Sequence, residues 1–210
     1  MRQMLILMTV ALLSSCQTSV PELVDIGQVP DFSFVDEAGA ALGTAQLRGR
    51  PYAVNFLFTS CPTSCPPLAE ASQALQKRVK RWSEGPEHAA QIVSITVDPL
   101  TDTPEKLKAF GQKYGSDPGV WRFARTDDYE KMEKLVTEGF MLPVLRKDAS
   151  RAKTVAERKK ILATDPTPLD TAHSLRFVLV DGEGKIRGLF NKSDEDLDKL
   201  DAALRHLAGR

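Results

Sequence analysis

Apolar residues in this chain form two kinds of pattern. Residues 52–58 are almost continuously apolar, which is typical of a strand buried on both faces of a sheet, and residues 91–97 predict a second core strand. Between them, apolar residues recur at helical spacing and predict a helix that runs from about residue 66 to residue 82. The apolar positions of this helix are Leu68, Ala71, Leu75 and Val79. Pro66 and Pro67 suit its first turn, where a backbone N–H has no helical partner.

The rest of the chain continues the alternation of strands and helices. Residues 31–35 alternate apolar and polar positions, and a turn at residues 37–39 predicts a short N-terminal hairpin. Two strands, over residues 175–180 and 185–190, flank a glycine-rich turn and predict a second hairpin. The other expected elements are helices over residues 104–114, 127–138 and 193–207 and a short strand over residues 120–124.

This order of elements predicts an α/β fold. Strands that alternate with helices form a largely parallel sheet covered by helices, and the last hairpin makes the central sheet mixed. The arrangement is the thioredoxin-like plan, with an N-terminal hairpin added and residues 141–171 inserted before the last hairpin. Residues 146–160 within this insertion carry many basic side chains and predict a solvated helix.

The first residues follow a different pattern, which predicts export. The apolar run over residues 4–13 is too short to span a bilayer, which takes about 20 residues. It predicts a signal peptide, and Leu13-Ser14-Ser15-Cys16 resembles the lipobox of bacterial lipoproteins. An ordinary secretory signal with an incidental cysteine is the alternative. The expected organisation is a lipoprotein signal peptide over residues 1–15, a tether over residues 16–29 lipidated at Cys16, and the domain over residues 30–210.

The charge balance gives no reason to expect a nucleic-acid partner. The sequence holds 28 Lys and Arg residues and 28 Asp and Glu residues, so its formal net charge is zero. Such a chain lacks the field that steers proteins toward nucleic acids or acidic membranes. Hydrophobic residues make up 42% of the sequence, as in an ordinary globular domain, and we expect a monomer.

The strongest chemical signal is Cys61-Pro62-Thr63-Ser64-Cys65, at the start of the first long helix. The two cysteines are about one helical turn apart, so both sulfurs can face the same side, and the helix dipole favours their thiolate forms. Two thiolates suit Cu(I), thiol–disulfide exchange or a structural disulfide in an exported protein. The residues alone leave these three roles open.

The histidines offer one candidate for a third metal ligand. The sequence has three of them. His173 precedes the last hairpin, which lies near the cysteine loop in a thioredoxin-like plan, whereas His88 falls in a polar connection and His206 near the end of the last helix. Zinc is less suited than copper to this set, because structural zinc sites take four ligands and only three candidates are present.

Three motifs in this order resemble the Sco/SenC family of copper-binding proteins of cytochrome c oxidase assembly. The first is the cysteine loop, which ends in Cys65-Pro66. The second is Asp98-Pro99 at a strand end, followed by Asp102-Thr103-Pro104 at a helix start. The third is His173-Ser174 before the strand and turn of the last hairpin. The resemblance covers about residues 29–207.

This resemblance implies a thioredoxin-like fold and copper held by Cys61, Cys65 and His173. It implies a copper chaperone that delivers copper to the binuclear copper site of cytochrome c oxidase subunit II, or to another exported copper or thiol protein. The alternative is a thiol–disulfide oxidoreductase in which Cys61 and Cys65 are the catalytic pair, with Cys61 as nucleophile. Together with the export signal, it places the chain on a membrane, through a lipid anchor, facing the periplasm or the cell exterior.

Two positions depart from the family pattern. Relatives commonly carry an aspartate directly before the histidine, where this chain has Ala172 and places Asp170 two positions earlier. A carboxylate beside a metal-binding imidazole orients the ring, so the change is expected to weaken or retune copper binding. Ser60 also stands where many relatives carry a bulkier or ionisable residue. A third candidate function is a sensor that binds a partner through residues 141–160. No feature of the sequence requires it, because a charged run is usually a solvated face.

Overall fold

The computed structural model describes residues 20–84, 88–142 and 175–210. Within them, one sheet of eight strands has the order β1-β8-β7-β4-β5-β6-β2-β3. The strands are β1 (Gly27–Gln28), β2 (Ser33–Asp36), β3 (Ala41–Gly43), β4 (Tyr52–Leu57), β5 (Gln91–Thr96), β6 (Trp121–Arg125), β7 (Phe177–Val180) and β8 (Lys185–Phe190). The helices are α1 (Thr44–Leu47), α2 (Cys65–Trp82), α3 (Pro104–Lys113), α4 (Tyr129–Lys134), a π-helix over Leu135–Gly139, and α6 (Asp194–Leu207).

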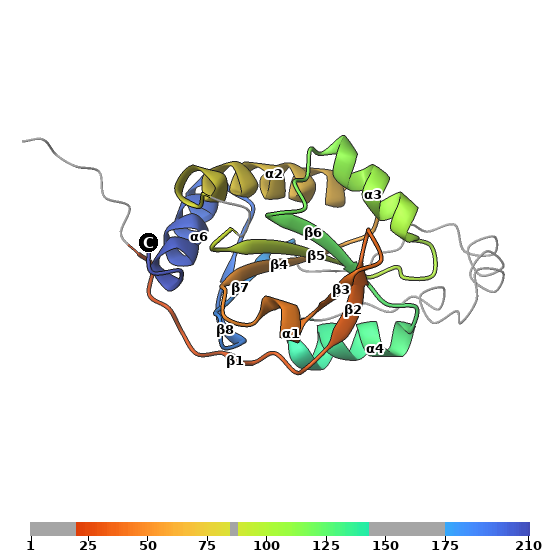
Figure 1. Cartoon of the computed structure of the whole chain (residues 1–210), viewed down its shortest axis with the longest axis horizontal. Coiled ribbons are helices and arrows are strands. Elements are labelled where there is room, and N and C mark those ends of the chain that lie inside the picture. The colour runs from red at the N-terminus through yellow and green to blue at the C-terminus, as the bar shows by residue number, and fades with distance from the viewer. Residues whose placement is uncertain (1–19, 85–87, 143–174) are drawn as a thin grey trace, which may run out of the picture.

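The sheet is mixed, and its parallel part lies at the centre. β4 pairs in parallel with β5, and β5 with β6, while β7 and β2 flank this unit in the antiparallel sense. In Figure 1, α2 and α3 lie above the sheet, α6 lies at the left beside α2, and α1 and α4 lie below the sheet. This layout places the loop after β4 and the start of α2 at the carboxyl end of a central parallel strand, where α/β folds gather their reactive groups.

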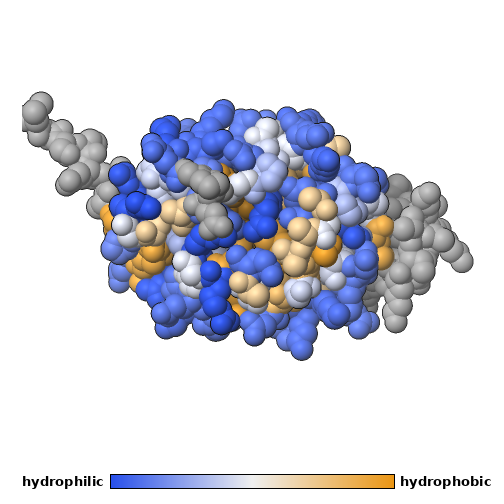
Figure 2. Space-filling view, in the orientation of Figure 1, coloured by the Kyte–Doolittle hydropathy of each residue, from blue (hydrophilic) through white to orange (hydrophobic). Residues whose placement is uncertain are grey.

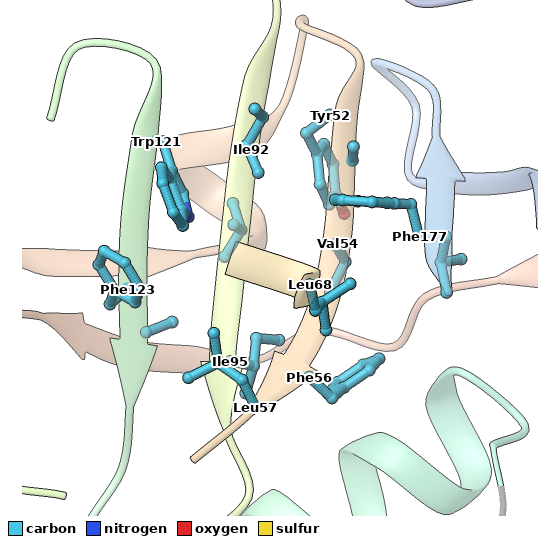
Figure 3. Packing of buried hydrophobic residues seen from close by; sticks show 14 of the residues in the cluster. Tyr52, Val54, Phe56, Leu57, Leu68, Ile92, Ile95, Trp121, Phe123 and Phe177 are labelled. Carbon is cyan, nitrogen blue, oxygen red and sulfur yellow. The ribbon is translucent and has the colours of Figure 1, made fainter. Parts of the chain in front are cut away.

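The core is built on the two central strands. All six residues of β4 and all six of β5 are buried, as expected of core strands, although Asn55, Gln91, Ser94 and Thr96 are polar. Figure 3 shows Trp121 and Phe123 of β6 and Phe177 of β7 beside this pair, with Leu68 of α2 packed near it. Figure 2 shows hydrophilic residues over the outer helical layers and apolar residues in the band between them.

The predicted mixed α/β fold is confirmed, including both hairpins. The expected helix over residues 127–138 divides into α4 and the π-helix that follows it. Two short elements have no counterpart in the sequence pattern, namely β1 and α1. Apart from residues 141 and 142, the predicted insertion over residues 141–171 lies outside the described residues.

The segment before residue 30 adds to the edge of the sheet. The backbone N–H groups of Val24 and Ile26 donate to the carbonyls of Arg187 and Ile186, at 3.2 and 3.0 Å, and β1 pairs with β8. The sequence assigns residues 16–29 to a tether, and in the structure the last part of that segment lies against β8. Within the described residues, no helix is long and apolar enough to cross a membrane.

Candidate metal and thiol site

The loop between β4 and α2 carries both candidate cysteines. Cys65 is the first residue of α2 and is fully buried, whereas Cys61 lies in the loop with 8% of its surface exposed. Both are free thiols. The backbone N–H of Phe58 donates to the Cys65 sulfur at 3.5 Å, which fixes Cys65 against the end of β4. Within the described residues, Cys61 is therefore the one member of the pair with any surface exposed to solvent.

The Cys61 sulfur occupies the N-terminal end of α2. The backbone N–H of Cys65 donates to it at 3.3 Å, and the Ser64 hydroxyl lies 3.1 Å from it. Ser64 is the residue before the first helical turn, yet its side chain caps no backbone group. The Cys61 sulfur takes this capping position, where the helix dipole stabilises negative charge.

The surroundings of the two thiols push their pKa values in opposite directions. Burial raises the pKa of Cys61, but hydrogen bonds from the side chains of Ser64 and Cys65 and from nearby backbone N–H groups outweigh it, so the net pKa lies below the usual range. Burial raises the pKa of Cys65, and the neighbouring Cys61 raises it further. Cys61 is therefore the more easily ionised thiol of the pair, and Cys65 holds its proton more tightly.

A buried carboxylate fastens the cysteine loop to the neighbouring strand. Asp102 is fully buried, and its carboxylate accepts hydrogen bonds from the backbone N–H of Thr59 at 3.0 Å and from the Thr59 hydroxyl. It also accepts one from the Thr96 hydroxyl at 2.6 Å, at the end of β5. This contact joins the loops at the carboxyl ends of two parallel strands.

The structure brings together two of the predicted site residues. His173 and Cys16 lie outside the described residues, so their predicted roles stay predictions. In the part of the chain that the structure describes, no group of three or more His, Cys, Asp or Glu side chains is placed to hold a metal. The Nδ1 atom of His88 lies 2.8 Å from the Ser83 carbonyl, and His206 lies in the last turn of α6, in agreement with the expectation that neither belongs to the cysteine site.

Sequence reasoning missed the roles of Ser64 and Asp102. The helix start at residues 102–105 is confirmed, but its N-cap is Thr103, whose side chain accepts from the backbone N–H of Lys106. Asp102 binds the cysteine loop instead. The sequence does contain a signal for this role of Asp102. It is a polar residue that directly precedes the N-cap Thr103 and is not needed to cap the helix.

The fold and site define a class of protein. It is a thioredoxin-like domain with an unequal pair of free thiols at a helix N-terminus, donors soft enough to bind Cu(I). The SCO1/SenC family model matches residues 25–209, and the chain belongs to this family.

Individual relatives agree with this assignment. The SCO1 protein homolog of Bacillus subtilis is 29% identical over 113 residues, which are 54% of this chain and 56% of that protein. A SCO1/SenC family lipoprotein from Bacillus anthracis is 26% identical, with a TM-score of 0.71 over 90% of this chain and 99% of its own. The chain thus spans only about half the length of the curated relative.

Two more distant structures share the fold. BsSco, a member of the Sco family of cytochrome c oxidase assembly proteins in which a disulfide switch was identified, has 23% identity and a TM-score of 0.70, with 89% and 96% of the chains covered. Bradyrhizobium japonicum ScoI, solved with copper bound, has 20% identity and a TM-score of 0.63, with 86% and 99% covered.

Proposed function

We propose that this chain is a copper chaperone that binds Cu(I) through Cys61, Cys65 and His173. In this proposal it delivers the metal to the binuclear copper site of cytochrome c oxidase subunit II, or to another exported copper or thiol protein. The observation that carries it is the pair of sulfurs joined at one helix N-terminus, of which only Cys61 is open to a partner. Family membership supports it, as does the fold shared with a relative solved with copper bound.

In this proposal the two thiols have different roles in the binding and the release of copper. Cu(I) meets the Cys61 thiolate first, and its charge then displaces the proton that Cys65 holds. Two thiolates around one Cu(I) leave a net charge of minus one, so a neutral His173 imidazole completes the site without adding charge. Release is ligand exchange: a thiolate of the recipient replaces Cys61, the accessible ligand, before Cys65 takes back its proton.

The proposal includes a membrane anchor at Cys16. Removal of residues 1–15 leaves Cys16 as the new first residue, and its lipids hold the domain at a membrane facing the periplasm or the cell exterior. The apolar run and small residues before Cys16 support this, and the Bacillus anthracis neighbour is a SCO1/SenC family lipoprotein. Detergent partitioning of wild type and Cys16→Ser tests it, because only the wild type is expected in the detergent phase.

The test of copper binding is metal content after anaerobic reconstitution with Cu(I). The starting protein is residues 16–210 with Cys16→Ser, which leaves Cys61 and Cys65 as its only thiols. We expect one copper per chain, none in the Cys61→Ser/Cys65→Ser double variant, and weaker binding in His173→Ala. Equal copper in the parent and the double variant, or none in the reduced parent, would refute the proposal.

A second function, thiol–disulfide exchange, is favoured by the unequal thiols. The Cys61 thiolate attacks a target disulfide, forming a mixed disulfide and releasing one target thiolate, which takes up a proton. Cys65 then loses its proton and attacks the Cys61 sulfur, which releases the second target thiol. Two electrons have passed to the target, and the chain holds a Cys61–Cys65 disulfide that an external dithiol must reduce.

Trapping separates this role from copper transfer. With a disulfide-bonded peptide, Cys65→Ser is expected to accumulate a mixed disulfide on Cys61, because the resolving thiol is absent, whereas Cys61→Ser forms none. If the reduced parent transfers no electrons to the peptide and Cys65→Ser traps nothing, thiol exchange is excluded.

A further inference from the structure

Asp102 is a fully buried carboxylate whose position is not explained by the helix that follows it. Burying a charge costs free energy unless donors surround it. Here the donors are the N–H and hydroxyl of Thr59 and the hydroxyl of Thr96. Two of these three come from the cysteine loop, 43 residues away in sequence, and none from α3.

The loop that carries Asp102 is itself held firmly. The Arg125 guanidinium, from the end of β6, donates from Nε to the Asp102 carbonyl at 2.9 Å and from Nη2 to the Pro99 carbonyl at 3.1 Å. The Asp102 N–H donates to the Asp98 carbonyl at 2.9 Å. The carboxylate is thus a fixed point, tied to β5 and β6 and aimed at the loop after β4.

The contact falls two residues before Cys61. Phe58 is buried in the core, Thr59 is bound to Asp102, and the Cys61 N–H closes a turn by donating to the Phe58 carbonyl at 3.2 Å. Cys65 is fixed by helix α2 and by the Phe58 N–H at the end of β4. Cys61, in contrast, depends on the loop for its place against the helix N-terminus.

We propose that Asp102 is a positioning residue for the thiol pair. Through Thr59 it holds the Cys61 loop so that both sulfurs are already arranged for one partner, whether a Cu(I) ion or the disulfide bond between them. Without it the loop samples more conformations, and ordering it again lowers the affinity for either partner. Only the copper half of this inference rests on the proposed function.

The experiment measures two properties of the pair in variants of the Cys16→Ser chain. One is the equilibrium between dithiol and disulfide in glutathione buffers, and the other is Cu(I) affinity by competition with a chelator. Asp102→Asn and Thr59→Val weaken the anchor, and Asp102→Ala removes it. Thr96→Val is the matched control, because it takes a hydrogen bond from the same carboxylate but leaves the Thr59 contacts in place.

We expect Asp102→Ala to shift both equilibria by about tenfold, the equivalent of about 1.4 kcal/mol. Thr59→Val and Asp102→Asn should shift them less, and Thr96→Val should leave them at the parent values even where it lowers the free energy of unfolding. If Asp102→Ala does not fold, Thr59→Val decides by the same measurements. Shifts no larger than those of Thr96→Val would overturn the inference. If the parent binds no copper, the glutathione equilibrium still tests Asp102, so the two failures are distinguishable.

Discussion

The Ser64 hydroxyl offers a direct test of how the protein activates Cys61. It lies 3.1 Å from the Cys61 sulfur and caps no backbone group of α2. The change Ser64→Ala therefore removes a donor to the thiolate and leaves the helix start as it is. We expect the pKa of Cys61 to rise, since this hydrogen bond is among the causes that lower it.

The size of the effect follows from the hydrogen bond. A bond to a charged group contributes about 1.5–3 kcal/mol, and the partial exposure of Cys61 favours the lower end. One pKa unit corresponds to about 1.4 kcal/mol, so the pKa of Cys61 should rise by about one unit. At a pH below both midpoints the thiolate fraction falls about tenfold, while the more basic thiolate is about threefold more nucleophilic. The net rate of alkylation should fall about threefold.

The assay is the pH dependence of iodoacetamide alkylation in the reduced Cys16→Ser chain. Ser60→Ala is the matched control, because Ser60 is an exposed serine one position before Cys61. Ser64→Ala should also unfold at the same urea concentration as the parent, although an ordinary capping serine contributes about 1 kcal/mol. An unchanged midpoint of alkylation, or a clear loss of stability, would show that Ser64 serves the helix and not the thiol.

Two further predictions concern stability and pH. Thr103→Ala removes the side chain that accepts from Lys106 at the start of α3, and it should lower the free energy of unfolding in urea by about 1 kcal/mol; no change would show that the cap contributes nothing. Because burial raises the pKa of Cys65, Cu(I) binding at neutral pH must release its proton, and the apparent affinity should rise by at least about tenfold per pH unit between pH 6 and 8. A pH-independent affinity in a chelator competition would mean that Cys65 is not a ligand.

The sequence predicts this fold well where patterns are long and local. The apolar run of β4, the pattern of β5 and the helical spacing of α2 predict buried strands and a covering helix, and both are observed. β1 has two residues, too few for any period to be detected. It forms because β8 offers it a hydrogen-bonding edge, which no local sequence pattern predicts.

In the candidate site, too, local contacts can be predicted from the sequence, whereas contacts between residues far apart in the chain cannot. The spacing of Cys61 and Cys65 predicts two sulfurs at one helix N-terminus, and the Cys61 contact with the Cys65 N–H confirms it. The contact of Asp102 with Thr59 joins residues 43 positions apart and depends on the strand order. The diversion of Ser64 from capping depends on its helical backbone angles, φ −92° and ψ −30°, which composition does not reveal.

The geometry of the thiol pair would make the two proposed functions, copper binding and thiol exchange, exclusive in time. Both need the same two sulfurs, and a Cys61–Cys65 disulfide leaves no thiolate to coordinate Cu(I). A chain that has just reduced a target therefore cannot load copper until an external dithiol restores its thiols. A recipient with cysteine ligands must likewise be reduced before it accepts the metal. The Cys61–Cys65 dithiol could therefore reduce the recipient and deliver copper to it only one after the other. Under both proposals, the reduction potential of the Cys61–Cys65 pair, which the Asp102 anchor is proposed to set, governs how much of the protein is in the dithiol form that can bind copper.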